Sequence, residues 1–172
     1  KHLSKKNTVG FTPIAGTHWY LLNTSKPPLS NAHLRKALAY SIDRNTIITH
    51  LLQGQQEPAY GILPPTMGYQ IPSFKSAPND AQEELAIALK ELGLKSAAEL
   101  PSLTLTYSRH ELTQKVAEAI EQQWKRELGI HIKLEGLEGK TFFNKRGNGA
   151  FEICSGNWLG DYNDPENFLS LF

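Results

Sequence analysis

The sequence contains a single cysteine, Cys154, and almost no excess of charge of either sign. One cysteine cannot form a disulfide framework within the chain or a cysteine-based metal site. The 18 basic and 17 acidic side chains give a formal net charge of +1, and they form no basic stripe. A nucleic acid or a membrane surface is therefore not expected as a partner. No apolar run approaches the roughly 18 residues that a membrane span needs.

Familiar terminal signals are also missing. The first residues, KHLSKKNTVG, are basic, but no apolar segment follows them, so they do not read as a signal peptide. The last residues, NFLSLF, stop inside an apolar pattern without a helix stop signal. We therefore expect a piece of a longer chain. Its 172 residues, 40% of them hydrophobic, fit a single domain with a core of its own.

The hydrophobic pattern predicts an α/β domain over residues 1–172. In the second half, strand patterns alternate with helical ones, which is typical of an α/β layer with parallel pairing. We expect a mixed or parallel sheet flanked by helices. Strands are expected over 14–23, 102–108, 130–136 and 150–158, and helices over about 31–42, 43–54, 79–92, 111–128 and 140–146.

Three local features refine this prediction. Leu112, Val116, Ile120, Trp124 and Leu128 recur every four positions, so they should form the buried stripe of the longest helix. Gly54 is expected to end the helix that Asp43 caps. A proline-rich loop should span residues 57–78, and loops of that length are often functional.

Several motifs for chemistry fail their own spacing rules. Gly139-Lys140-Thr141 imitates the end of a P-loop, but the position that needs the first glycine is Leu134. No two of the six histidines have the spacing that places two zinc ligands on one helix face. No Gly-x-Ser-x-Gly turn is present. We therefore expect no catalytic residue, metal or cofactor.

The stretch GNWLGDYNDP, residues 156–165, has two open interpretations. It can be a capped helix start, in which Asp161 or Asn163 accepts from backbone amides and Pro165 takes the first helical position. Alternatively, the carboxyl end of a strand presents Trp158 and Asp161 to a ligand crevice, as is usual in open α/β sheets.

Two alternatives from other functional classes also remain open. One is a small hydrolase that uses Asp161 and Asp164 as its acid–base pair. The other is an interaction domain whose loop 57–78 docks partners.

The sequence resembles the oligopeptide/dipeptide-binding family of extracytoplasmic solute-binding proteins (family 5), which deliver ligand to ABC importers. The likeness covers about residues 14–172. It rests on HLRKALAYSIDRNTII, LPPTMGY, LTLTYS, KVAEAIEQQWKRELGIHIKLEGLEGKTFF and GAFEICSGNWLGDYNDPENFL. Family members are longer, two-lobed chains of the type II periplasmic-binding-protein fold that close around ligand. The resemblance implies that this chain is most of the second lobe, and that the first lobe is missing from it.

The resemblance also implies roles at matching positions. The aspartate at the place of Asp161 pairs with a peptide's α-amino group, and the tryptophan at the place of Trp158 lines a side-chain pocket. We count Asn157, Tyr162 and Tyr107 with them as candidate ligand-binding residues. The implied partners are a peptide, the first lobe and the membrane permease of an ABC transporter. The implied location is the bacterial periplasm or a lipid anchor at the cell surface.

Departures from the family pattern leave the ligand open. Ser155 stands where some peptide binders carry an arginine, and Thr113 stands where a histidine is found. Relatives carry nickel complexes, haem or sugars, so these remain alternative ligands. Asp161 favours a ligand with a free amino group.

Overall fold

The computed structural model of the chain describes residue 10, residues 12–69 and residues 78–172. The elements follow in the order β1 (Gly16–Leu22), α1 (Ala32–Tyr40), α2 (Arg44–Ile47), the π-helical turn η2 (Ile48–Leu52), the 3-10 helix η3 (Pro65–Met67), α3 (Pro78–Leu92), the 3-10 helix η4 (Ala97–Glu99), β2 (Leu103–Ser108), α4 (Glu111–Leu128), β3 (Ile132–Leu137), α5 (Gly139–Gly147), β4 (Ile153–Leu159) and α6 (Glu166–Leu169). No helix in these ranges combines the length and apolar character that crossing a membrane requires.

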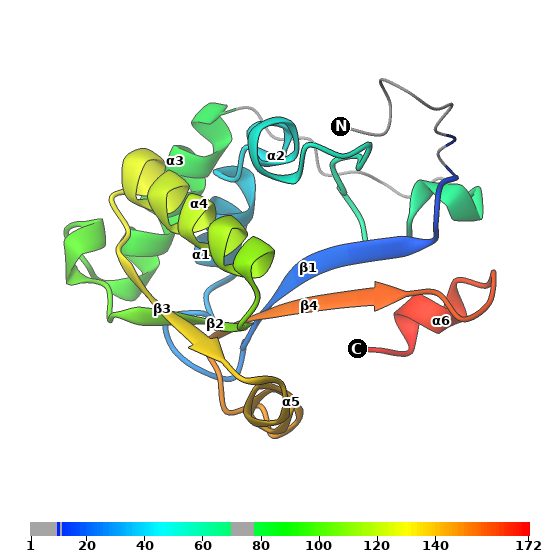
Figure 1. Cartoon of the computed structure of the whole chain (residues 1–172). Helices are drawn as coiled ribbons and strands as arrows, with labels where there is room; N and C mark the ends of the chain where they lie inside the picture. Colours follow the sequence, from blue (N-terminus) through cyan, green and yellow to red (C-terminus); the bar gives the residue numbers. More distant parts are fainter. Residues whose placement is uncertain (1–9, 11, 70–77) are drawn as a thin grey trace.

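The four strands form one mixed sheet in the order β1-β4-β2-β3 (Figure 1). Strand β2 is parallel to both β3 and β4, as the alternation of strands and helices predicts. Strand β1 instead runs antiparallel to β4 along the whole of both strands, from Gly16 opposite Leu159 to Leu22 opposite Ile153. Because β2 pairs only with the first two residues of β4, the β1–β4 ribbon extends well beyond the rest of the sheet.

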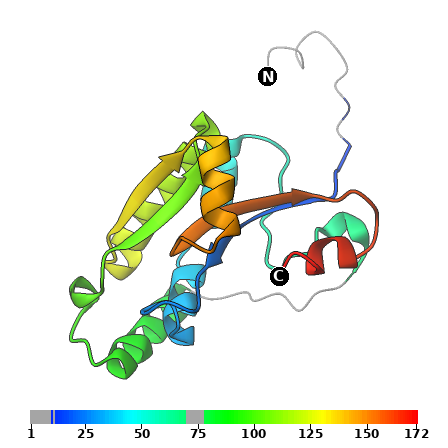
Figure 2. The same ribbon diagram turned by 90° about the horizontal axis from the view of Figure 1, so that it is seen from below.

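Helices cover the two faces of the sheet unequally. Helices α1, α3 and α4 lie on one side of it and α5 on the other (Figures 1 and 2). The main core lies between the sheet and the first group, and its fully buried members include Leu34, Leu38, Leu105, Trp124 and Ile153. The indole Nε1 of Trp124 donates to the backbone oxygen of Leu38 at 2.8 Å. Trp124 therefore joins α4 to α1 as well as filling space.

Helix boundaries follow the capping signals at most ends. Asn31 accepts from the backbone nitrogen of Leu34 at the start of α1, and Asp43 accepts from that of Thr46 at the start of α2. Gly129 ends α4 with a φ of 67°, in the left-handed region that favours glycine.

Two expectations about the helices are wrong. Gln53, not Gly54, closes the second helix: its nitrogen bonds to the oxygen of Ile48 across a π-helical turn, and it takes a φ of 50°. The wider turn moves the end of the helix by one residue. Leu112 does not belong to the buried stripe: its side chain is 50% exposed, and the buried residues of α4 begin only at Ala117.

The proline-rich segment 57–78 is described only in part, because residues 70–77 lie outside the described ranges. Its described part contains the short helix η3 and the buried side chain of Met67. Helices η3 and α6 lie at the same outer end of the β1–β4 ribbon (Figures 1 and 2).

Candidate ligand-binding site

The stretch 156–165 lies where β4 leaves the sheet. Its last strand residues are paired only with β1, and after Leu159 the chain turns through residues 160–165 into α6. Helix α6 packs back against the ribbon, with Phe168 fully buried. The carboxyl end of β4 is thus held in place while its side chains remain accessible.

Trp158 and Asp161 are held by one buried side chain. The half-buried Trp158 donates its indole Nε1 hydrogen to Asn167 Oδ1 at 2.7 Å, and the backbone nitrogen of Asp161 donates to the same oxygen at 3.1 Å. Asn167 is only 6% exposed. Sequence reasoning missed this residue, since an asparagine inside a short polar helix gives no signal of burial.

The Asp161 carboxylate is exposed and has no hydrogen-bond or ion-pair partner in the described part of the chain. The expectation that Asp161 or Asn163 caps the following helix is wrong. Asp164 Oδ1 accepts from the backbone nitrogen of Glu166 at 2.9 Å, because Asp164 directly precedes Pro165, which already has helical backbone angles. Asp161 is therefore left available for a cationic group.

Tyr162 is exposed and donates its hydroxyl hydrogen to the carboxylate of Glu166, four residues later. This bond raises the pKa of the Tyr162 hydroxyl, because the protonated form is the donor, while the nearby Asn167 side chain acts in the opposite direction. Tyr162 thus stands beside Asp161 as a neutral aromatic group.

The other two candidate residues lie on the opposite face of the sheet. Side chains alternate along a strand, so Asn157 and Trp158 point to different faces. Asn157 is exposed and lies opposite His18 of β1. Tyr107 is on the same face as Asn157 but belongs to the core, where it is 6% exposed and its ring lies against Gly136. The structure therefore brings Trp158, Asp161 and Tyr162 together and separates them from Asn157 and Tyr107.

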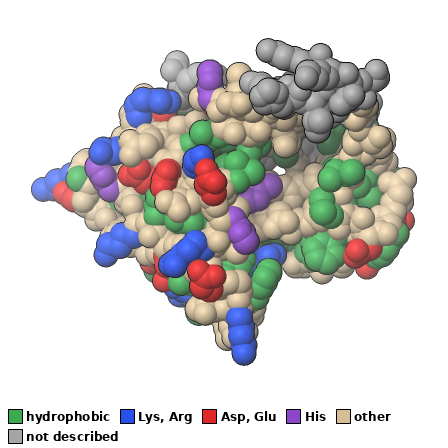
Figure 3. Space-filling view, in the orientation of Figure 1, with side chains coloured by type: hydrophobic (Ala, Val, Ile, Leu, Met, Phe, Trp, Pro, Cys, Tyr) green, Lys and Arg blue, Asp and Glu red, His purple; other side chains and the backbone are tan. Residues whose placement is uncertain are grey.

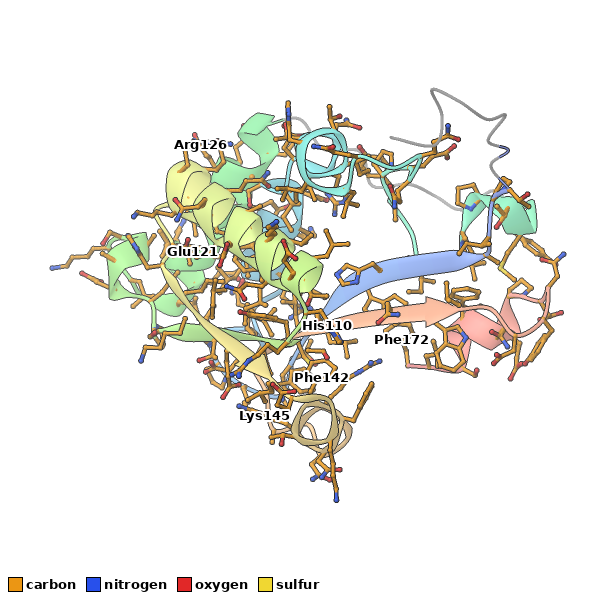
Figure 4. All side chains as sticks on the ribbon, viewed as in Figure 1. His110, Glu121, Arg126, Phe142, Lys145 and Phe172 are labelled. Carbon is orange, nitrogen blue, oxygen red and sulfur yellow. The ribbon has the colours of Figure 1, made fainter. Side chains whose placement is uncertain are left out.

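A further aromatic group, Trp19 of β1, shares the face of Trp158. Its indole lies directly over Gly156, where an added Cβ would come within 2.7 Å of Nε1. Its ring centroid is 5.7 Å from that of Phe172, which lies next to β4 on the α6 side (Figure 4). The buried Nε1 of Trp19 has no acceptor within the described residues. Sequence reasoning used Trp19 only as a strand former.

The surface around these aromatic groups is apolar. In the space-filling view, hydrophobic side chains gather over the outer end of β4 and α6 (Figure 3). The exposed ones there are Tyr162, Leu169, Leu171 and Phe172, whereas the exposed Leu159 points to the face of β4 opposite Trp158. This end of the molecule therefore joins a free carboxylate to a broad apolar wall, which suits a ligand with a cationic group and apolar parts.

Groups for covalent or metal chemistry are not found at this end. Burial raises the pKa of the Cys154 thiol to about 11, so it remains protonated and unreactive at neutral pH. Among the described residues no cluster of three or more histidine, cysteine or acidic side chains could hold a metal ion.

The model of one protein family, described as bacterial extracellular solute-binding proteins, family 5 Middle, matches residues 2–172. The chain belongs to this family. The oligopeptide-binding protein OppA of Bacillus subtilis (strain 168) is 41% identical to it over 99% of the chain, but the match covers 32% of that relative. Among family 5 relatives the chain thus spans about a third of the full length.

Solved structures of family 5 proteins share the fold. A periplasmic oligopeptide-binding protein, OppAIV of Borrelia burgdorferi, superposes with a TM-score of 0.83 at 36% identity, over 92% of this chain and 31% of that one. Haemophilus influenzae OppA in complex with RPPGFSPFR superposes with a TM-score of 0.82 at 32% identity, over 92% of this chain and 32% of that one. The predicted family, and the predicted α/β class of the type II periplasmic-binding-protein fold, are confirmed.

Proposed function

We propose that the chain is most of the second lobe of a longer, two-lobed substrate-binding component of an ABC importer, and that it takes part in binding oligopeptides or dipeptides between the lobes. The single observation that carries this proposal is the free Asp161 carboxylate held beside Trp158 at the carboxyl end of β4. Membership of family 5 and the peptide-binding names of its relatives support the same reading.

The chemistry of the site fits the amino-terminal residue of a peptide. An α-ammonium group pairs best with a carboxylate in a site that excludes water, through charge-assisted hydrogen bonds. Trp158 offers an apolar, sequence-tolerant surface to the neighbouring side chain. Asn157 and Tyr107 lie on the other face. In this proposal they contact a more distant part of the ligand, or they affect binding indirectly through the packing of the core.

Binding without catalysis fits the site better than hydrolysis. In the alternative of an acid–base pair both carboxylates act on a substrate, but one oxygen of Asp164 is engaged with the backbone N–H of Glu166 at the start of α6. The relatives described above carry the names of binding proteins. We therefore assign Asp161 a binding role.

We propose the location and partners from the description of the family and the names of its relatives. Family 5 is described as extracellular, and relatives are named periplasmic. We place the whole protein in the periplasm, or at the cell surface on a lipid anchor, where it would hand its ligand to the membrane permease of the importer.

Calorimetry on the full-length protein tests this function. We expect mixed di- to pentapeptides with a free amino terminus to bind, and the same peptides with an N-acetyl group to bind much more weakly, because the acetyl group removes the cation. Equal binding of both forms would contradict the proposed role of Asp161. If the protein bound a nickel complex, haem or a sugar but no peptide, its ligand would belong to that class and not to the peptides.

A further inference from the structure

Asn167 is a buried amide that hydrogen-bonds two of the candidate binding residues, Trp158 and Asp161. It belongs to α6 and is 6% exposed. Its Oδ1 accepts from Trp158 Nε1 at 2.7 Å and from the backbone nitrogen of Asp161 at 3.1 Å. One side chain that does not face solvent thus hydrogen-bonds two of the residues that form the accessible part of the site.

Each of these bonds fixes a group that is otherwise free to move. The indole of Trp158 is only half-buried, so the bond at Nε1 determines which ring face is presented. Asp161 comes after the last paired residues of β4, and Gly160 before it is tied to Ala15 by a backbone bond of 2.8 Å. The hydrogen bond from the Asp161 amide to Asn167 also fixes the backbone of the next residue, which carries the free carboxylate.

We propose that Asn167 is a positioning residue for ligand binding: its amide oxygen holds the Trp158 indole and the Asp161 backbone in one fixed relation. This inference rests on the proposed function of the site. An amide oxygen has two lone pairs and can accept both hydrogens at once. Because the amide is buried, losing it leaves two donors unsatisfied in a poorly solvated place, which costs more than losing an exposed bond.

A second buried amide provides a matched control. Gln123 of α4 is 5% exposed, and its side chain accepts from the backbone nitrogen of Asp43 at 2.9 Å and donates to the Asp43 oxygen at 3.3 Å. It ties α4 to the start of α2, in the helical part of the molecule. Replacing Gln123 by leucine should therefore lower the stability of the fold by a similar amount, at a place away from the site.

The test compares Asn167→Leu, Asn167→Asp and Gln123→Leu with the wild type in the full-length protein. Two quantities are measured: hydrogen exchange of the Trp158 indole N–H, assigned by NMR with Trp158→Phe, and the Kd for one tripeptide in its free-amino and N-acetylated forms. A purely structural role would lower stability in both leucine variants but would not change the ratio of the two Kd values.

We expect Asn167→Leu to speed indole exchange at least about tenfold, to weaken free-amino peptide binding about tenfold or more, and to reduce the preference over the acetylated form. Asn167→Asp keeps an acceptor oxygen and should restore slow exchange and most of the binding. Gln123→Leu should leave both the preference and the exchange within about twofold of wild type.

Different results overturn different claims. An unchanged preference in Asn167→Leu, or fast exchange of the Trp158 indole in the wild type, overturns the positioning role, and the second needs no variant to fold. A wild type that binds no peptide overturns the proposed function instead, and the exchange measurements then decide alone whether Asn167 orders this end of the molecule.

Discussion

Asp161 and Asp164 are chemically identical and three residues apart, yet the fold uses their carboxylates differently. Asp164 accepts the backbone N–H of Glu166 at the start of α6, while Asp161 donates its own N–H to Asn167 and leaves its carboxylate free. The difference arises from backbone direction, because Pro165 places Asp164 next to the helix start. Of the two, Asp161 is the one whose carboxylate oxygens are both free of hydrogen bonds to the described residues, whereas Asp164 Oδ1 is engaged at the start of α6.

A glycine at position 156 is required by the indole of Trp19. An added Cβ would lie 2.7 Å from Trp19 Nε1 and 3.0 Å from Cε2, so Gly156→Ala must displace a ring that is wedged between β4 and Phe172. We expect a loss of about 1–3 kcal/mol in the free energy of unfolding, as for other overpacked sites. Urea denaturation followed by circular dichroism measures it.

Gly139→Ala is the matched control for this change. Gly139 begins α5, and an added Cβ would meet nothing within 4 Å. Alanine there should be neutral or slightly stabilising, since it restricts the unfolded chain and favours helix. If the two variants changed stability equally, the close contact between Trp19 and Gly156 would not be a real constraint.

At the residue scale the sequence singled out Trp158 and Asp161 as candidates, but it could not predict the side chains that surround them. Trp19 and Asn167 come from β1 and α6, and they join the site only through the antiparallel pairing of β1 with β4 and the packing of α6. The spacing of residues along the chain predicts neither the strand pairing nor the packing of α6. Tyr107 remains a candidate through the resemblance to the family, and the sequence did not predict that its side chain is only 6% exposed and packs in the core.

At the scale of elements, the sequence predicted the features that depend on residues close together in the chain. Helix α4 was predicted with both ends correct, because a four-residue apolar repeat and Gly129 mark its course. Strand β1 was predicted over residues 14–23, but its antiparallel pairing with β4 was not, because its partner is at the far end of the chain and strand direction depends on the whole path. The π-helical turn before Gln53 likewise has no sequence signature.

Helices α1 and α3 are joined by a small group of charges. His33 Nδ1 is 2.5 Å from Glu84 Oε2, and Lys36 Nζ is 3.3 Å from Glu84 Oε1. The hydrogen bond with His33 is the main reason that the pKa of Glu84 lies below its usual value of 4.5, and Lys36 adds to it. A lowered folded-state pKa means that the stabilisation is present above 4.5 and is lost as the pH falls through the folded-state value.

We therefore expect Glu84→Gln to flatten the dependence of stability on pH below about pH 5. Urea midpoints measured from neutral pH downward should differ most between wild type and variant at neutral pH and converge in acid. Glu83→Gln removes the charge of an exposed neighbour and should leave the wild-type profile nearly unchanged. Parallel profiles for wild type and Glu84→Gln would show that this carboxylate does not stabilise the contact between the helices.

At the scale of the whole molecule, the chain spans about a third of the length of its relatives. In the proposed two-lobed protein, the apolar wall and the free carboxylate form one side of the site. Half of a site encloses only part of a ligand, and affinity depends on shielding polar groups from water.

We expect the isolated 172-residue chain to bind peptides at least about a hundredfold more weakly than the full-length protein. Calorimetry with the same tripeptide on both proteins measures this difference, and circular dichroism establishes whether the isolated chain is folded. Equal affinity in the two would mean that the site does not lie between two lobes.

The central claim is that Asp161 receives the ammonium group of a ligand, and the most direct test is calorimetry of full-length Asp161→Asn. The change keeps the shape and removes the charge, and losing one partner of a desolvated ion pair costs about 2–5 kcal/mol, or roughly 30- to 4,000-fold in affinity. We predict this loss for a free-amino tripeptide, little further loss for its N-acetylated form, and near wild-type binding for the control Asp164→Asn. Equal binding of the free-amino peptide by wild type and Asp161→Asn would contradict the account.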